Sequence, residues 1–295
     1  MRNTVSGEAP LEIGCKGERS LDAPARGIAG TSRRQGLHGQ HLEALLALPL
    51  LLFFVLPVIS IFVRTSPQAF LASLGKVEVQ QAIGISLKTT LIALIVIVLL
   101  GTPMAYWLSR QRGRLARGLE TLVDLPTVLP PSVAGLALLM AFGRRGLLGP
   151  LLSSWGIELA FTQAAVVMAQ VFVASPYYVR SAMNGFSSLD AETLQAAEID
   201  GANDGQIMRF ITLPLIRNFL LSGGVMSWSR ALGEFGATIL FAGNFIGRTQ
   251  TMPLAIYLGM ESDLEGALAL SVILVLISFL ALWLLRVFVG RYEFS

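Results

Sequence analysis

Six apolar stretches of about 20 residues or more constrain the fold of this chain more than any other feature. A helix needs about 20 mainly apolar residues to cross the hydrocarbon core of a bilayer, and only helices or closed barrels satisfy their backbone groups there. Runs of this length are typical of helices. The sequence therefore predicts an all-α, polytopic membrane protein with six transmembrane helices, at 43–63, 86–108, 118–142, 160–179, 217–241 and 266–289.

The composition supports lipid as the main solvent of the chain. Charged residues make up 14% of it, whereas a soluble domain typically has about 25%, and the mean hydropathy is +0.66. The net charge of +3 would be compatible with nucleic acid. The basic residues lie mostly between the apolar runs, however, and this pattern indicates membrane topology. We therefore expect the lipid bilayer as a partner and no nucleic acid.

The distribution of Lys and Arg predicts the orientation of the spans. Segments that lie on one side of the six spans carry fifteen of the 22 basic residues, and this side is expected to be cytoplasmic, with both termini on it. The fifteen are Arg2, Lys16, Arg19, Arg26, Arg33, Arg34, Arg110, Arg112, Arg114, Arg117, Arg180, Arg209, Arg217, Arg286 and Arg291.

The first forty residues have a different character. They are rich in Gly, Ser, Arg and Glu, and they contain neither apolar periodicity nor the hydrophobic region of a signal peptide. We expect residues 1–40 to form a disordered cytoplasmic tail. Its Cys15 is the one cysteine of the chain, so no internal disulfide or cysteine-based metal site is expected.

A polar stretch, "LQAAEIDGANDGQIMRFITLP", separates the fourth and fifth spans. Ser187 and Asp190 are spaced as in a capping box, and they predict a helix over about 190–200. Gly201 then fits the position after a helix end, because glycine takes positive φ without a steric penalty. Asn203, with Gln206 as its partner, predicts the start of a second short helix.

That second helix would present Ile207, Phe210 and Ile211 on one face and would end at Pro214, where the next span begins. Two interpretations follow from the residues alone. The stretch is either a docking element for a cytoplasmic partner or an interfacial linker between two spans.

The spacing of this stretch resembles a known motif. Gln195-Ala196-Ala197, three residues, Gly201, nine residues and Ile211-Thr212-Leu213-Pro214 are similar to the cytoplasmic signature loop of type I ABC importer permeases. The family usually has glutamate at the position of Gln195, so no ion pair is expected there. The resemblance implies that the loop docks in a groove of an ATP-hydrolysing subunit through Gln195, Ala196, Ala197, Gly201, Ile207, Phe210, Ile211, Leu213 and Pro214.

The resemblance also implies an assembly. It predicts a homodimer of permeases, two nucleotide-binding ATPase subunits and an extracytoplasmic oxyanion-binding protein, in the cytoplasmic (inner) membrane of a prokaryote. The chain contains no Walker A pattern, so ATP and Mg are expected in the partner ATPase, with no cofactor in this chain and no enzymatic activity of its own. Its regions would be the tail, 41–82 with the first helix and an external loop, 83–289 as the ABC transporter type-1 transmembrane domain, and 290–295 as a short cytoplasmic end.

Two further segments resemble the molybdate permeases of this group. They are "DLPTVLPPSVAGLALLMAFGRRGLLG" and "ALGEFGATILFAGNFIGRTQTMPLAIY". The resemblance implies import of molybdate, and also of tungstate, by alternating access. A sulfate or thiosulfate permease is the nearest alternative. An ion-coupled secondary transporter would need paired acidic residues in the membrane, and a structural or sensory membrane protein would not need the signature loop.

Prolines and hydroxyl groups are the candidates for an oxyanion path. Pro126, Pro130 and Pro131 are expected to interrupt the third span, and interrupted spans are tolerated where they line a cavity. Hydroxyls would offer neutral donors to the anion, or they would instead bond to carbonyls of their own helices. The hydroxyl candidates are Thr127, Ser132, Ser222, Ser227 and Ser229.

Arg230 and Glu234 are expected deep in the fifth span, followed by Phe235, the third candidate for a path or gate there. A charge at a helix centre costs about 2.5–3.5 kcal/mol on the insertion scale, so both charges should face protein or water. Their i, i+4 spacing allows them to pair. Either Arg230 attracts the dianion while Glu234 moderates it, or the pair is a structural lock between subunits near the outer gate.

Overall fold

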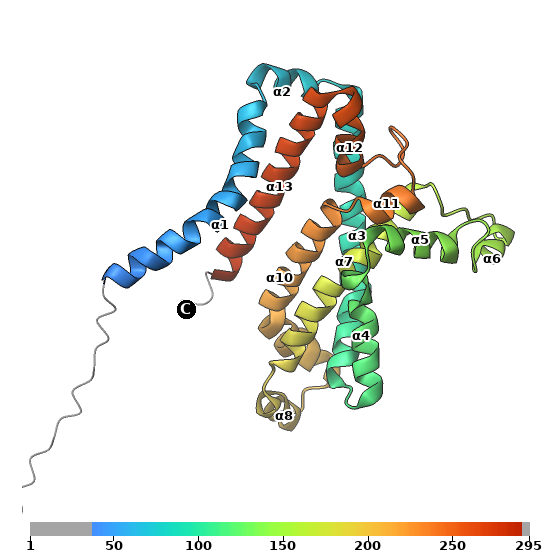
Figure 1. The fold of residues 1–295 in the computed structure, drawn as a ribbon. Helices are drawn as coiled ribbons and strands as arrows, with labels where there is room; N and C mark the ends of the chain where they lie inside the picture. The colour runs from blue at the N-terminus through green and yellow to red at the C-terminus, as the bar shows by residue number, and fades with distance from the viewer. Residues whose placement is uncertain (1–36, 291–295) are drawn as a thin grey trace, which may run out of the picture. The chain divides into compact units, whose positions relative to one another are not determined.

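The computed structural model describes residues 37–290, and every regular element in this range is a helix (Figure 1). The chain divides into two units, Met1–Phe53 and Phe54–Ser295, and helices α2 to α13 lie in the second. The all-α prediction is confirmed for the described residues. The elements are α1 (Leu37–Arg64), α2 (Pro67–Leu74), α3 (Val77–Arg110), α4 (Arg114–Val128), α5 (Pro131–Phe142), α6 (Gly149–Ser154), α7 (Gln163–Ser187), α8 (Ala191–Ile199), α9 (Asp204–Gln206), the π-helix η1 (Ile207–Thr212), α10 (Leu213–Leu232), α11 (Gly236–Phe241), α12 (Met252–Ser262) and α13 (Leu264–Gly290).

Most of the predicted N-terminal tail, residues 1–36, lies outside the described residues, as do 291–295. Helix α1 begins at Leu37, within the last residues of the predicted tail. The expected external loop before residue 82 contains the helix α2, which starts with Pro at its first turn and is capped by Ser66.

Four helical segments in the described chain are long and apolar enough to cross a membrane, and five if one bent pair counts as a span. The four are Leu45–Arg64, Val77–Arg110, Asp204–Leu232 and Leu264–Trp283. They correspond to the first, second, fifth and sixth predicted spans. The count of six is therefore not reached by length and composition.

The third predicted span, 118–142, is two helices rather than one. Helices α4 and α5 meet at an angle of 115°. Leu129 and Pro130 are extended at the break, because the proline ring disfavours helix in the residue before it and removes a backbone donor. Pro126 stays inside α4, so the expectation that it interrupts the helix was wrong.

The fourth predicted span, 160–179, corresponds to the first part of helix α7, which begins at Gln163 and continues to Ser187. The prediction that Arg180 belongs to the following loop was therefore wrong. Helix α7 contacts α3, α4, α5, α10 and α11, so most of its surface faces protein. A helix enclosed in this way carries polar side chains such as Gln170 and Tyr178, and these lower its hydropathy below that of a lipid-facing span.

The fifth predicted span, 217–241, is also broken. Helix α10 ends at Leu232, and a short connection leads to the six-residue helix α11. Glu234 therefore lies at a break between helices and not at a helix centre. Arg230 remains in the last turn of α10.

At the centre of the core, α3, α7 and α10 pack on one another through small residues and hydroxyls. Gly223 of α10 allows close approach, since a Cβ at this position would lie 2.7 Å from the Ser181 Cβ on α7. Ser181 Oγ donates to the Phe219 carbonyl at 2.6 Å, and the Thr102 and Tyr178 hydroxyls share a hydrogen bond of 2.7 Å between α3 and α7. Interfaces made of small residues, with hydrogen bonds between the helices, are typical of membrane proteins.

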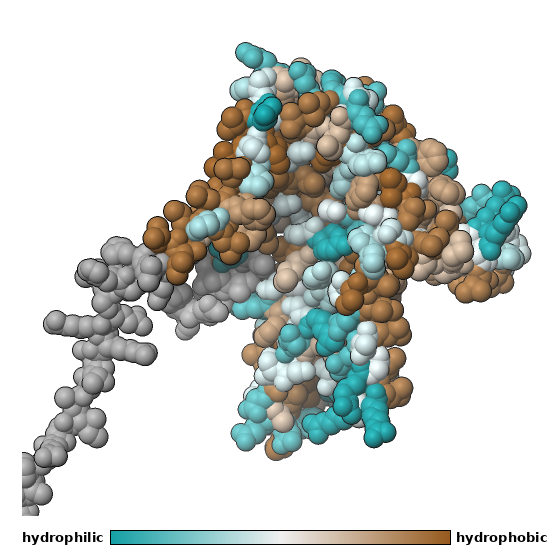
Figure 2. Space-filling view, viewed as in Figure 1, coloured by the Kyte–Doolittle hydropathy of each residue, from teal (hydrophilic) through white to brown (hydrophobic). Residues whose placement is uncertain are grey.

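The surface separates by polarity along the helices. Figure 2 shows hydrophobic atoms over the sides of the helices and hydrophilic atoms gathered at the end where α8 and the α3–α4 turn lie. At the other end, Lys76 Nζ donates to both carboxylate oxygens of Asp263, at 2.8 and 2.7 Å, and joins the start of α3 to the α12–α13 turn. The Lys76 ammonium, with the Gly266 amide, lowers the pKa of the Asp263 carboxyl.

Two adjacent glycines of α10 give a test of the close packing. Gly223→Ala should destabilise the protein by about 1–3 kcal/mol, the usual cost of overpacking. Gly224→Ala is the matched control, because the nearest atom to its added Cβ is 3.9 Å away, and the gain in helix propensity should leave stability equal or higher. Thermal unfolding of both purified variants in detergent measures this. An unchanged Tm for Gly223→Ala would contradict the packing described for α7 and α10.

Candidate functional site

The α8 turn forms as its capping residues predict, with one difference. The Asp190 carboxylate accepts from the Glu192 amide at 3.2 Å and caps α8 alone. Ser187 is the last residue of α7, so the predicted capping box with Ser187 was wrong. Because Ser187 still belongs to α7, its side chain does not cap the start of α8.

The end of α8 is a Schellman motif centred on Gly201. The Gly201 amide donates to the Glu198 carbonyl and the Ala202 amide to the Ala197 carbonyl, both at 3.0 Å. Gly201 has φ of +87°, which confirms the predicted left-handed position. Asn203 and Gln206 then form the predicted capping box, with bonds of 3.0 and 2.9 Å.

The second helix does not end at Pro214. Helices α9, η1 and α10 form one continuous helical segment, Asp204–Leu232, of 29 residues. The π-helical turn η1 precedes the proline, and the Leu213 amide donates to the Met208 carbonyl five residues back. This wider turn accommodates the ring and the missing donor of Pro214, so the helix continues where the sequence predicted a stop.

The π-turn also changes which side chains share a face. Ile207 is buried, Ile211 is half-buried and Phe210 is 67% exposed, so the predicted common face of the three does not form.

The other predicted docking residues differ in exposure. Ala197 is buried, whereas Gln195, Ala196 and Pro214 are exposed, and Leu213 packs against the core. A hollow of 330 Å³ lies on this surface, lined by Asp200, Gly201, Ala202, Gln206, Phe210 and Ile211.

A second cavity, of 620 Å³, lies beside α8 toward the end of α3. Tyr106 and Arg110 of α3 line it, with the guanidinium 4.3 Å from the ring centre, and Leu194 and Glu198 line it from α8. Helix α8 thus has open space on its α3 side. The caps at its two ends and its contact with η1 hold it in place.

The two helix breaks lie against each other. A Cβ on Gly236, the first residue of α11, would come within 2.5 Å of the Pro131 Cβ at the start of α5. A Cβ on Gly135 would come within 2.8 Å of the Ala237 carbonyl oxygen. Ser132, which is exposed, and Phe235, half-buried with its ring centre 5.2 Å from that of Tyr257, therefore belong to one region.

Glu234 is buried where the two helix breaks meet, and both of its carboxylate oxygens accept hydrogen bonds. Its Oε2 accepts from Arg230 Nη1 at 2.8 Å and its Oε1 accepts from the Ala237 amide at 2.8 Å, so the side chain caps α11. It is 1% exposed, whereas the Arg230 side chain is 30% exposed. The predicted i, i+4 pairing is confirmed.

The predicted hydroxyls have separate surroundings. Ser227 is buried and donates to the Ala174 carbonyl of α7 at 2.8 Å, so it bonds to another helix rather than its own. Thr127 is exposed and donates to the Asp124 carbonyl of its own helix at 2.7 Å. Ser229 is half-buried, with its hydroxyl oxygen enclosed, and Ser222 is half-buried.

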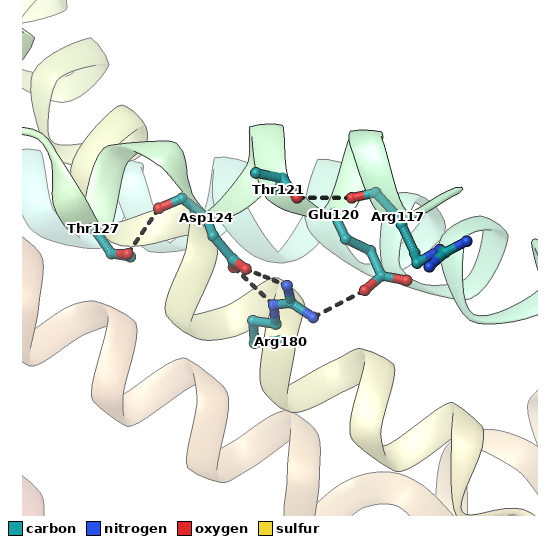
Figure 3. Close-up of polar contacts among 6 residues, drawn as sticks. All are labelled: Arg117, Glu120, Thr121, Asp124, Thr127 and Arg180. Carbon is teal, nitrogen blue, oxygen red and sulfur yellow. Dashed lines mark hydrogen bonds and ion pairs between the residues drawn. The ribbon is translucent and has the colours of Figure 1, made fainter. Parts of the chain in front are cut away.

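The structure also brings together a charged cluster that the sequence did not predict (Figure 3). Arg180 of α7 contacts two carboxylates of α4: its Nε lies 2.7 Å from Asp124 Oδ1, its Nη2 contacts Asp124 Oδ2, and its Nη1 lies 3.3 Å from Glu120 Oε2. Glu120 and Asp124 are one helical turn apart. The spacing of these two carboxylates within the predicted span 118–142 is the sequence feature that could have indicated the cluster.

A comparison with protein families identifies the chain. The family described as binding-protein-dependent transport system inner membrane component matches residues 97–294. The chain belongs to this family. The permease is therefore a multi-pass component of the inner membrane and a non-catalytic transport subunit, and the earlier resemblance is confirmed at the level of the family.

Individual relatives also match most of the chain. The permease is 44% identical over 228 residues to the "Molybdenum transport system permease protein ModB" of Mycobacterium tuberculosis, covering 77% of this chain and 86% of that one. It is 32% identical over 232 residues to the "Sulfate transport system permease protein CysW" of Synechococcus elongatus, covering 78% and 81%. A bacterial ABC transporter for alginate import shares its fold, with a TM-score of 0.67 at 16% identity, over 86% of this chain and 96% of that one.

The left-handed conformation at Gly201 yields a test. We call residues 190–203, which contain α8 and the turn at Gly201, the α8 loop. Gly201→Val should strain this loop by about 1–2 kcal/mol, because L-residues rarely adopt this conformation. No atom lies within 4 Å of the added Cβ, so strain rather than a clash is the cause. We expect normal membrane insertion and lost binding-protein-dependent transport, with Gly201→Asn much less affected because asparagine tolerates positive φ. Full transport by Gly201→Val would contradict the role predicted for this turn.

Proposed function

We propose that the chain is the membrane-spanning permease subunit of an ATP-driven importer of molybdate, and also of tungstate. The observation that carries this proposal is the 44% identity to a molybdenum transport permease, over 77% of this chain and 86% of the relative. The sulfate permease relative, at 32% identity over a similar length, makes sulfate the alternative substrate.

The proposed complex contains two copies of this chain, two ATPase subunits that hold ATP and Mg, and an extracytoplasmic binding protein that delivers the oxyanion. Both termini and the α8 loop would lie in the cytoplasm, as the distribution of basic residues predicts. The exposed edge of the loop, Gln195, Ala196 and Phe210, with the hollow beside Gly201, would dock on the ATPase.

The continuous helix offers a mechanical route for coupling. Displacement of α8 by the ATPase would pass through the capped turn at Gly201 and Asn203 to the segment Asp204–Leu232, which is about 40 Å long at 1.5 Å per residue. The far end of this segment is the break at Gly233, where α11 and α5 meet. Movement at the loop would thus shift the two helix breaks and alternate the access of the path.

Polar groups at the breaks would guide the oxyanion without trapping it. Thr127, Ser132 and Phe235 would border the path, with Ser227 as a helix-joining residue behind it. For Arg230 and Glu234 we favour the structural lock, because Glu234 is buried and fully engaged by Arg230 and by the α11 amide, so it is not free to face an anion.

Labelled molybdate uptake tests the substrate. Proteoliposomes would contain this chain with its candidate ATPase and binding protein, with ATP inside and a large excess of sulfate outside. ATP-dependent uptake that survives the sulfate supports a molybdate importer. Uptake abolished by sulfate would move the assignment to the sulfate alternative.

Arg230→Ala separates the two roles considered for Arg230. If the ion pair is a lock, the variant should lower the Tm of the complex or its assembly, since it leaves the buried Glu234 carboxylate without its cation. Uptake per assembled complex should then change little, whereas a dianion-attracting role predicts lost uptake with intact assembly. Arg248→Ala, an exposed arginine of the loop after α11, is the matched control.

A further inference from the structure

The charged cluster of Arg180, Asp124 and Glu120 lies between α7 and α4. Asp124 is about ten residues into α4, and Arg180 is about two turns before the end of α7. Asp124 and Glu120 lie in α4, one of the two helices of the bent pair that would count as a fifth span. Charges at such positions face protein or water, because lipid would not solvate them.

The cluster is accessible. The side chains of Arg180, Asp124 and Glu120 are 40%, 35% and 30% exposed in this chain. Since that exposed face cannot be turned to lipid, it faces either a water-filled path or another protein chain. The geometry at the guanidinium favours the first of these.

Asp124 occupies the face of the Arg180 guanidinium that an oxyanion would use. The Nε and Nη2 groups donate in parallel to the two carboxylate oxygens, which is the bidentate arrangement that arginine offers equally to carboxylates and to tetrahedral oxyanions. Glu120 takes the remaining Nη1 side at 3.3 Å. One cation faced by two carboxylates gives the cluster a net charge of −1, and in this arrangement it repels a dianion.

We propose that Arg180 is an oxyanion-binding residue of the translocation path and that Asp124 and Glu120 are the carboxylates that compete with the anion for it. This inference rests on the proposed function. When α4 carries its carboxylates away, Arg180 presents two parallel donors to an oxyanion. When they return, as in this structure, the anion is displaced and released.

Helix α4 is suited to such a movement. It is separated from α5 by the break of 115° at Leu129 and Pro130, so α4 can tilt without carrying α5 rigidly with it. Helix α4 packs mainly against α7 and also contacts α3. The Arg180 cluster is its polar attachment to α7.

Retention of molybdate by the purified complex tests the proposal. The complex of this chain with its ATPase subunits would be incubated with molybdate, desalted, and analysed for molybdenum per complex. Asp124→Asn should retain at least about tenfold more than the unmodified complex, on the scale of one charged hydrogen-bond contact. Asp124→Asn/Arg180→Gln should return to the original level.

Matched variants separate an anion site from a simple clamp between α4 and α7. Asp124→Glu keeps the charge and should keep retention low, and Glu158→Gln, which removes an exposed carboxylate 3.6 Å from Arg144, should have no effect. Glu120→Gln offers a second variant should Asp124→Asn fail to assemble, with a smaller increase expected. An assembled Asp124→Asn complex with unchanged retention would overturn the proposal, as would equal retention by the double variant.

The same measurement with sulfate keeps this inference distinct from the proposed substrate. If Asp124→Asn retains sulfate but not molybdate, the anion site stands and the molybdate assignment fails. If the unmodified complex imports molybdate and none of the assembled variants retains either anion, the function stands and Arg180 is not the site.

Discussion

The unbroken helix from Asp204 to Leu232 connects the α8 loop to the helix breaks. Backbone groups in a membrane must be satisfied within the segment, so a proline there has to be accommodated rather than exposed. The π-turn η1 does this at Pro214, through the bond from the Leu213 amide to the Met208 carbonyl. As a result, the α8 loop and the helix break at Gly233 are the two ends of one rigid element.

Close packing makes that element part of the core. Gly223 allows α10 to approach α7, and Ser181 and Ser227 add hydrogen bonds between the two helices. Because of this packing, a movement of the Asp204–Leu232 segment would also move α7, which carries Arg180. In this way the loop, the helix breaks and the charged cluster on α4 and α7 are mechanically connected, although they are far apart in the sequence.

The sequence predicted what depends on neighbouring residues. Gly201, Asn203 and Gln206 take the conformations that their local chemistry favours, and the long apolar runs are helices. It missed features that depend on tertiary contacts. Arg180 follows an apolar run and was assigned to a loop, because only the packing of α7 against its neighbours shows that the helix continues. Its partner Asp124 is 56 residues away, and no local pattern joins the two.

The helix breaks show the same limit. The prolines after Leu129 correctly indicated an interruption, yet the same reasoning wrongly predicted interruptions at Pro126 and Pro214. Whether a proline breaks a helix depends on what satisfies the carbonyl it leaves without a donor. At Pro214 a wider turn accommodates it, whereas at Pro130 and Pro131 two consecutive prolines direct the chain into an extended conformation.

The proposed function requires that an ATPase drives the permease through the α8 loop. Crosslinking tests this most directly, with Ala196→Cys in a chain whose single cysteine, Cys15, is replaced by serine. Ala196 is exposed beside the Gly201 turn. We expect a crosslink from this position to the ATPase subunit that changes in yield between the ATP-bound and nucleotide-free complex. Labelling of the same cysteine by a membrane-impermeant reagent from outside the cell, with no crosslink to the ATPase, would contradict it.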